Sequence, residues 1–389
     1  MPLKHKPKRI LFATYWWLED LMRAVAHQAA ARGWHLNFQM CLDYHLPESW
    51  RGDGIITNLS GDLDELAAFF KRARCPAVSL SQLHPEIDIP RVGMDEAKAG
   101  QLAAEHFLDR EFRSFAHYTR QPHNRCPEAY ASFEKVLSQA GYDDNGLNWQ
   151  NARGGTRDNW ENRQRWLRRE LRQLPKPLAV FAREPLSPAE VIEAAIDEGL
   201  SVPHDVAVLG VFDIALFQES TTVPVSCVIH DFEEHARLAC DLLSRMMDGE
   251  AAPPKPLLIP PVGIATREST DTMAARHPDV RRVVRHMLRH FAEPLTVKDF
   301  VEMSSLSQTN LYKAFNEDLG QTPHEMLTRI RVRKAKQMLQ ETDKKLRAVS
   351  EDCGFSDPVN LFRQFKQRLG VTPAEYRKRS PDQSLRSFR

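Results

Sequence analysis

The chain has 389 residues, of which 42% are hydrophobic and 27% are charged, so it is long enough for two or three domains with cores of their own. The sequence shows no apolar run of the roughly 18 residues that a membrane-spanning helix needs, and its basic N-terminus lacks the apolar segment of a secretory signal. We therefore expect a cytoplasmic protein without a membrane partner. The six cysteines form no Cys-x-x-Cys pair, which argues against a zinc module or a disulfide framework and indicates free thiols.

The net charge of +1 hides two parts of opposite sign. Residues 277–389 hold 22 lysines and arginines against 14 acidic residues, whereas residues 1–276 hold 31 against 38. A basic C-terminal part suggests contact with a polyanion such as nucleic acid. The same excess can also be a solvated surface, so charge alone leaves both interpretations open.

From residue 9 to about residue 270, short apolar runs alternate with stretches of helical periodicity. This alternation predicts parallel sheets with helices on both faces, and the segment is long enough for two such lobes. Ligands of such folds bind outside the carboxyl ends of the strands. The predicted strands span residues 10–15, 54–57, 77–80, 115–118, 178–181, 206–210 and 225–228, and the predicted helices span 18–32, 62–74, 97–110, 128–140, 158–171, 188–198 and 232–247.

After Ala274 the apolar residues recur at helical spacing and strand-like runs disappear, which predicts an all-α region. The polar stretch at residues 268–272 lacks apolar periodicity and marks the expected boundary. We therefore predict an α/β domain over residues 1–272, an all-α domain over 277–380 and a frayed tail over 381–389.

An internal repeat with an offset of fifty residues is the most informative feature of the all-α region. Each copy has the pattern of two short helices joined by a tight turn. In the first copy a helix over residues 297–303 is followed by a second helix with Ser307 as its N-cap. In the second copy the helices are at 346–352 and after the N-cap Asp357, where Pro358 stands at the first helical position. The identical pairs are Asn310 and Asn360, Leu311 and Leu361, Phe315 and Phe365, Leu319 and Leu369, Gly320 and Gly370, Thr322 and Thr372, Pro323 and Pro373, and Glu325 and Glu375.

Two similar helix pairs could form a plain helical bundle, but a bundle does not need a duplicated set of caps and turns. Two recognition helices about 34 Å apart can enter successive major grooves of DNA, which does explain the duplication. Helical periodicity directs outward Gln308, Thr309, Tyr312 and Asn316 in the first copy, and Pro358, Val359, Phe362 and Lys366 in the second. We expect phosphate contacts or support of the recognition helices from Lys313, Arg329, Arg331, Arg333 and Arg363.

Residues 349–377 resemble the C-terminal signature of the AraC/XylS family of bacterial transcription regulators almost throughout. The resemblance implies sequence-specific binding of double-stranded DNA, with the outward residues of the first copy as base readers. Pro358 and Val359 stand where this family is usually polar, and Leu361 stands where it usually has Phe. The second helix is therefore expected to read DNA shape and thymine methyl groups more than hydrogen-bonding edges.

The α/β region resembles the two-lobed periplasmic-binding-protein-like domain of LacI/GalR regulators, through the stretches at residues 202–210 and 258–270. The resemblance implies that residues 1–272 bind a small-molecule effector, a sugar or an acid sugar, and form a homodimer. We expect effector contacts from Tyr15, Trp16 and Trp17 as stacking surfaces and from Arg120, Arg183, Asp213 and His230 as polar groups.

Several positions of the expected effector site differ from the LacI/GalR pattern. Phe212 stands where the family usually has a sugar-binding aspartate, with Asp213 one place later, and Arg183-Glu184 replaces the usual Asn-Asp pair. The family's sugar-binding arginine falls on Ala129 or Tyr130. A sugar hydroxyl left without its acceptor costs about 1–3 kcal/mol, so we expect weak binding of plain aldopentoses. Arg120 and Arg183 favour an anionic ligand.

No group of residues indicates catalysis, a metal or a cofactor. His230 and His235 are five residues apart and do not share a helix face, so they are not the zinc motif His-Glu-x-x-His. The glycine-rich patterns of nucleotide sites are absent from the sequence. We therefore predict an effector-sensing transcription regulator that is not an enzyme. The alternative is a ligand-independent constitutive or architectural DNA binder whose α/β body only dimerises.

Overall fold

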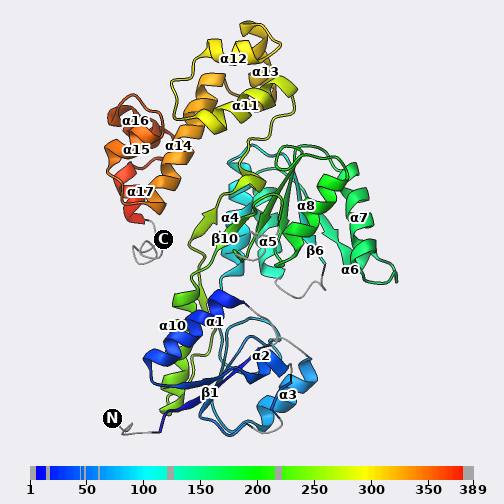
Figure 1. Ribbon diagram of the computed structural model, residues 1–389, viewed down its shortest axis with the longest axis vertical. Coiled ribbons are helices and arrows are strands. Elements are labelled where there is room, and N and C mark those ends of the chain that lie inside the picture. The colour runs from blue at the N-terminus through cyan, green and yellow to red at the C-terminus, as the bar shows by residue number, and fades with distance from the viewer. Residues whose placement is uncertain are drawn as a thin grey trace.

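The computed structural model describes residues 6–14, 18–43, 45–47, 50–59, 62–120, 127–214 and 221–379. Two α/β lobes and a helical domain follow one another along the long axis of the molecule (Figure 1). This arrangement confirms the predicted fold class. None of the described helices is long and apolar enough to cross a membrane. The five cysteines in the described ranges are free, as expected.

The N-terminal lobe contains a four-stranded parallel sheet of order β2-β1-β3-β4. Strand β1 shows why this sheet forms, because Ile10 and Phe12 pack into one apolar cluster and Leu11 and Ala13 into another. Parallel sheets covered by helices on both faces require burial of this kind. The elements are β1 (Arg9–Ala13), α1 (Glu19–Ala31), β2 (His35–Asn37), α2 (Gln39–Asp43), β3 (Gly54–Thr57), α3 (Leu63–Arg72), β4 (Ala77–Ser79) and, from late in the chain, α10 (Phe232–Met247), which packs against α1.

The C-terminal lobe contains a six-stranded sheet of order β12-β10-β9-β8-β6-β7, in which only β12 is antiparallel to its neighbour. All five side chains of β8 are fully buried, so this strand lies at the centre of the lobe. The elements are α4 (Glu96–Leu108), β6 (Ser114–Thr119), α5 (Pro127–Gln139), β7 (Asp144–Asn148), α6 (Trp149–Ala152), α7 (Trp160–Gln173), β8 (Leu178–Ala182), α8 (Ser187–Asp197), β9 (Val206–Gly210), β10 (Ser226–Ile229), β12 (Gly263–Ala265) and the 3-10 turn η1 (Glu268–Thr270).

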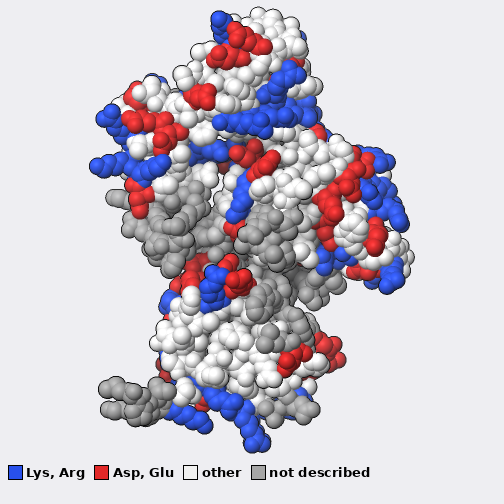
Figure 2. All heavy atoms as spheres, in the orientation of Figure 1, with Lys and Arg blue, Asp and Glu red and all other residues white. Residues whose placement is uncertain are grey.

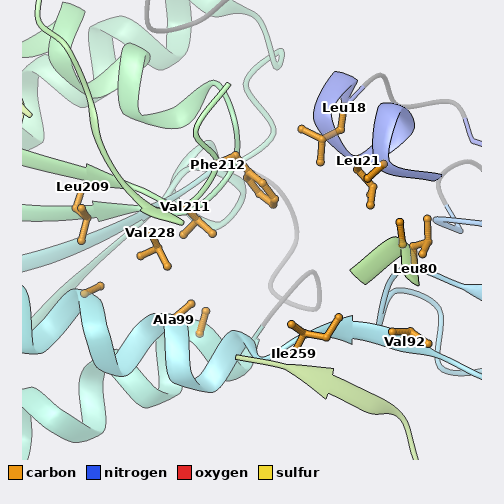
Figure 3. Packing of buried hydrophobic residues seen from close by; sticks show 14 of the residues in the cluster. Leu18, Leu21, Leu80, Val92, Ala99, Leu209, Val211, Phe212, Val228 and Ile259 are labelled. Atoms are coloured by element: carbon orange, nitrogen blue, oxygen red, sulfur yellow. The ribbon is translucent and has the colours of Figure 1, made fainter. Parts of the chain in front are cut away.

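The chain crosses between the lobes three times. It passes from β5 (Val92–Met94) to α4, from β10 to α10, and from β11 (Leu257–Ile259) to β12, and β5 and β11 pair in parallel at the crossing. One apolar cluster extends through both lobes. Figure 3 shows Phe212 pointing out of the C-terminal lobe toward the side where Leu18 and Leu21 lie. Phe212, two residues after β9, therefore lies on the side of the C-terminal lobe that faces the N-terminal lobe.

The helical domain has two apolar cores that share one helix. The first half of α14 contributes Met326, Leu327 and Ile330 to one core, and its second half contributes Val332 and Ala335 to the other. A helix buried at both ends connects the two halves rigidly. The elements are α11 (Pro278–His290), α12 (Val297–Met303), α13 (Gln308–Leu319), α14 (Pro323–Glu341), α15 (Leu346–Asp352), α16 (Pro358–Leu369) and α17 (Pro373–Arg379).

The polar stretch that precedes the helical domain is bound to the C-terminal lobe. Ser269 and Thr270 are fully buried. The Ser269 hydroxyl donates to the Val208 carbonyl at 2.6 Å, and the Thr270 hydroxyl donates to Ser226 Oγ at 2.7 Å. The connection between lobe and helical domain is therefore confined to the few residues between Thr270 and the start of α11.

Candidate DNA-binding and effector sites

The two helix-turn-helix motifs repeat each other at the level of helix caps. Ser307 accepts a hydrogen bond from the Asn310 amide at the start of α13, and Asp357 accepts the equivalent bond from Asn360 at 2.7 Å at the start of α16. Both helices end at a glycine with positive φ, 66° at the first copy and 70° at the second. The fifty-residue repeat therefore encodes the start and the end of each recognition helix.

The helix after each recognition helix is also capped in the same way. Thr322 and Glu325 form a capping box before α14, with 2.8 Å from the Thr322 amide to the glutamate. The Thr372 amide donates to Glu375 at 2.8 Å before α17. Helix α17 is thus the second copy's counterpart of α14.

The predicted outward residues of both recognition helices lie at the protein surface. In α13, Leu311 and Phe315 are fully buried, whereas Gln308, Thr309, Lys313 and Asn316 are exposed and Tyr312 is half-buried. In α16, Leu361 and Phe365 are fully buried, Pro358 is half-buried, and exposed side chains are Val359 at 75%, Phe362 at 41%, Arg363 and Lys366. An exposed valine and an exposed phenylalanine fit an apolar contact with thymine methyl groups. Contact of these residues with DNA stays a prediction.

Of the two roles expected for Arg331 and Arg333, a phosphate contact or support of the fold, the structure favours support. The Arg331 guanidinium donates to the carbonyl of Phe291 at 2.8 Å and to that of Glu293 at 2.7 Å, so it holds the end of α11. Arg333 lies 3.4 Å from Asp271, and burial lowers the pKa of both arginines. Both guanidinium groups therefore bind other groups of this protein.

Other cations of the helical domain pair with acidic groups of the C-terminal lobe. Arg329 contacts Glu111, Lys334 lies 3.2 Å from Asp271, and Lys336 lies 3.9 Å from Asp109. We call these residues, together with Arg333, the interdomain ion-pair cluster. Part of the predicted basic surface is neutralised in this cluster, and Figure 2 shows basic and acidic side chains mixed over the helical domain.

A buried hydrogen-bond network connects helix α4 to the segment that carries Asp271. Arg110, two residues after α4, donates to the carbonyl of Thr270 at 2.9 Å and to that of His106 at 3.0 Å. His106 Nε2 lies 2.8 Å from the Thr270 hydroxyl. Burial lowers the pKa of His106 and of Arg110 well below their usual values. The C-terminal end of α4 is therefore fixed to the boundary with the helical domain.

Both arginines predicted for the effector site are paired with buried glutamates. Arg183 contacts Glu96 through two nitrogens, with 3.0 Å for one of them, and its guanidinium lies 5.2 Å from the Phe212 ring centre. Arg120 lies 3.3 Å from Glu190, a side chain that is 8% exposed. Neither arginine is a free cation for an acid sugar, and their contact with an effector stays a prediction. No sequence pattern indicated Glu96 as a site residue.

The remaining polar groups near the strand ends differ in how they are held. Asp213 is bound by Arg267 at 2.6 Å. His230 is 9% exposed, its Nε2 has no hydrogen-bond partner within the described ranges, and burial lowers its pKa to about 4. His230 is therefore neutral at pH 7, and its Nε2 can donate or accept a hydrogen bond with a ligand. Tyr15, Trp16 and Trp17 lie outside the described residues.

Glu184 and Tyr130 form a second polar group at this edge of the sheet. Glu184 accepts hydrogen bonds from the Thr119 hydroxyl at 2.6 Å, from Ser187 at 3.0 Å and from Tyr130 at 3.4 Å. Ala129 is fully buried and has no polar side chain. Of the two positions predicted to replace the sugar-binding arginine, only Tyr130 can bind a ligand through a side-chain hydrogen bond.

A two-lobed α/β body followed by a duplicated helix-turn-helix defines a DNA-binding transcription regulator with a sensor domain, not an enzyme. Residues 104–270 match the periplasmic binding protein-like domain and residues 300–379 match a helix-turn-helix domain. The chain therefore joins a LacI-like sensor to an AraC-type DNA-binding domain.

Proteins with the same order of domains are known. The chain is 24% identical over 339 residues to the xylose operon regulatory protein of Escherichia coli K12, with 85% of each chain covered. It is 23% identical over 333 residues to the protein of the same name from Haemophilus influenzae, with 84% of each chain covered. A solved structure of the xylose-binding transcription activator xylR superimposes with a TM-score of 0.62 and 22% identity, over 98% of this chain and 100% of that chain.

Proposed function

We propose that this protein controls transcription by binding duplex DNA through α13 and α16 and by binding a neutral sugar between its two lobes. The duplicated caps and exposed faces of the two recognition helices carry the DNA-binding part of this proposal. A DNA-binding regulator works where the chromosome is, so we propose the cytoplasm as its location. A Lac repressor structure that superimposes with a TM-score of 0.53 is a dimer, and we propose a homodimer here as well.

The DNA-binding part is tested by selection of bound sequences from a random duplex library. The full chain should select a defined sequence, and Gln308→Ala should relax the preference at one or two base pairs, at a cost of about 1–3 kcal/mol. The control Gln139→Ala changes an exposed side chain on α5 of the sensor and should leave the preference unchanged. Uniform loss of affinity in Gln308→Ala would exclude Gln308 as a base reader.

Charge balance at the strand ends favours a neutral ligand. Glu96 compensates Arg183, and Glu190 together with Asp158 compensates Arg120 and Arg163. A sugar carboxylate would have to displace a buried glutamate from its arginine, and an uncompensated buried charge is costly. Neutral hydroxyl groups can instead form a hydrogen bond with His230 Nε2. The relatives named above are two regulators of the xylose operon and one xylose-binding transcription activator. Phe212 in place of the expected aspartate predicts that xylose binds this chain weakly and that another neutral sugar binds better.

Calorimetric titration of the full chain with neutral pentoses, neutral hexoses and uronic acids tests the effector. A neutral sugar at 100 times its Kd should add roughly 2.7 kcal/mol to the free energy of unfolding. His230→Asn should weaken its binding about tenfold, whereas His27→Asn, an exposed histidine on α1, should not. Preferential binding of a uronic acid would contradict the neutral-ligand proposal. Binding of no sugar at all would favour the ligand-independent regulator.

Helix α4 offers a direct connection between the effector site and the DNA-binding domain. Its first residue, Glu96, contacts Arg183 beside Phe212, and Asp109 and Glu111 beyond its last residue contact α14. A helix of 13 residues spans about 20 Å. Sugar binding that changes the Glu96 contact would therefore displace a rigid element that ends at the interdomain ion-pair cluster.

The coupling is measured as the ratio of DNA affinities with and without the sugar, which for allosteric proteins is typically about 5–150-fold. Glu96→Gln should bring the ratio close to one while DNA binding without sugar persists. Glu105→Gln is the matched control, because Glu105 lies exposed on the same helix. An unchanged ratio in Glu96→Gln would show that the signal does not pass through this contact.

A further inference from the structure

Three side chains with metal-binding atoms come together on the C-terminal lobe, away from the recognition helices. His117 comes from β6, Glu134 from α5 and Asp144 from the first position of β7, and one ligand atom of each lies within 4.8 Å of the other two. His117 Nδ1 contacts Asp144 and is 3.8 Å from Glu134 Oε1. Bonds of about 2.0–2.2 Å put the ligand atoms of one tetrahedral ion about 3.3–3.6 Å apart, so a rotation of the exposed Glu134 side chain toward His117 would close the site.

The histidine is held in place by the surrounding fold. Its ring stacks on Tyr130 with ring centres 4.5 Å apart and an angle of 27° between the planes. Gly146 lies opposite His117 in the pairing of β6 with β7, and a Cβ at this glycine would lie 3.2 Å from the imidazole. The His117 and Asp144 side chains are only 12% and 3% exposed, whereas Glu134 is 53% exposed. The cluster is therefore rigid on two sides and open to solvent on the third.

One oxygen of the cluster is not satisfied by protein atoms. Asp144 Oδ2 contacts His117, but Asp144 Oδ1 is buried and has no hydrogen-bond partner within the described ranges. A buried carboxylate oxygen without a partner costs free energy. An ion pair between His117 and Asp144 leaves Asp144 Oδ1 without a partner, whereas a bound cation would supply one.

We propose that His117, Glu134 and Asp144 bind a divalent transition-metal ion, with Zn²⁺ as the best candidate. One imidazole nitrogen and two carboxylates suit zinc, cobalt or manganese, and water would complete the coordination through the open side. On binding, the Nδ1 proton that His117 shares with Asp144 leaves to solvent, and the Nδ1 lone pair and the carboxylate oxygens bind the ion. Two carboxylates balance the charge of the ion. Magnesium should bind weakly because it prefers oxygen ligands in a near-ideal octahedron.

The test is titration of the untagged full chain with Co²⁺ and Zn²⁺ after treatment with a chelator, without DNA or sugar, so the result does not depend on the proposed function. Wild-type protein should bind one equivalent and give the visible absorption bands of protein-bound cobalt. His117→Gln and Glu134→Gln should each weaken binding at least about tenfold. Glu128→Gln, an exposed glutamate on the same helix as Glu134, is the matched control and should not change it.

Glu134→Gln keeps the test decisive if a change at the buried His117 affects folding, because Glu134 is half-exposed and its loss leaves the core intact. Thermal melts of each variant show which ones are folded. A wild-type protein without a saturable cobalt spectrum would overturn the proposal. So would zinc affinity that is equal in wild type, Glu134→Gln and a folded His117→Gln, because the ion would then bind elsewhere among the 15 histidines of the chain.

Discussion

Arg333 in the DNA-binding domain lies 3.4 Å from Asp271 at the end of the sensor, and Lys334 reaches the same carboxylate at 3.2 Å. The side chains are only partly exposed: 17% for Arg333, 18% for Lys334 and 30% for Asp271. One partly buried carboxylate therefore compensates two cations. Because Arg110 binds the neighbouring Thr270 carbonyl, this carboxylate is also fixed to helix α4.

The first prediction concerns the loss of that carboxylate. Asp271→Asn should lower the free energy of unfolding by about 1–3 kcal/mol, because two partly buried cations lose their counter-ion. It should also speed proteolysis between the lobe and the helical domain. Glu302→Gln breaks an exposed pair with Lys298 and should change stability by less than about 0.5 kcal/mol. Urea unfolding of both variants compares their free energies of unfolding. Equally small changes would show that the interdomain ion-pair cluster contributes little to stability.

The second prediction compares two glycines with positive φ in the second helix-turn-helix. A Cβ at Gly354, φ 74°, would lie 2.5 Å from the Phe291 carbonyl oxygen, whereas a Cβ at Gly370, φ 70°, would meet no atom within 4 Å. Gly370→Ala should cost about 1–2 kcal/mol from backbone strain alone. Gly354→Ala should cost clearly more, because main-chain atoms of Phe291 and Ala292, which follow α11, must move. Thermal unfolding of the two variants measures the loss of stability. Equal losses would mean that the backbone around Phe291 accommodates the new Cβ without a further loss of stability.

The helical domain was the most predictable part of the fold because its helix ends are encoded locally. Ser307 and Asp357 cap helices at the positions that the sequence indicated, and Thr296 caps the helix that was predicted to begin at residue 297. Helix α17 was missed, although its Thr372 and Glu375 repeat the signature of Thr322 and Glu325. Strands β2, β5, β7, β11 and β12 were also missed. Four of them have only three residues, and β7 has the polar sequence Asp-Asn-Gly-Leu-Asn instead of an apolar run.

Site residues could be predicted where their exposure depends on the periodicity of a single helix. They could not be predicted where it depends on contacts between distant parts of the chain. The exposed face of α13 follows from the buried positions of Leu311 and Phe315 on the same helix. The partner of Arg183 is Glu96, 87 residues earlier in the chain, and that of Arg333 lies 62 residues away. No local pattern indicates such pairs, so arginines that are neutralised in the fold were predicted to meet ligands or phosphates.

The third prediction separates a phosphate contact from a structural arginine. Binding of the full chain to duplex DNA should weaken as salt rises, and Arg363→Ala should reduce the slope of log affinity against log salt by about 0.9. Arg363 is exposed on α16, and its only contact in the described ranges is a 3.2 Å hydrogen bond with Asn360. Arg331→Ala should leave this slope unchanged but lower stability, because the Phe291 and Glu293 carbonyls lose their donor. A reduced slope in Arg331→Ala would return Arg331 to the DNA contact surface.

The fourth prediction is a loss of stability in mild acid that depends on His230. Burial lowers the pKa of His230 to about 4 in the folded protein, against about 6.5 in the unfolded chain. Between these values the unfolded chain binds a proton that the folded protein does not, so stability falls as the pH decreases from 6.5 to 4. The contribution of this one residue should reach about 3 kcal/mol at the low end of this range. Burial also lowers the pKa of His204 to about 4, so part of the loss of stability in acid will remain in any single variant.

Urea unfolding at several pH values measures this effect. The free energy of unfolding should depend less steeply on pH for His230→Asn than for wild type, while His27→Asn should match wild type. Parallel curves for wild type and His230→Asn would show that His230 takes up its proton equally in both states, and that it is not the neutral, ligand-ready group that the effector proposal requires.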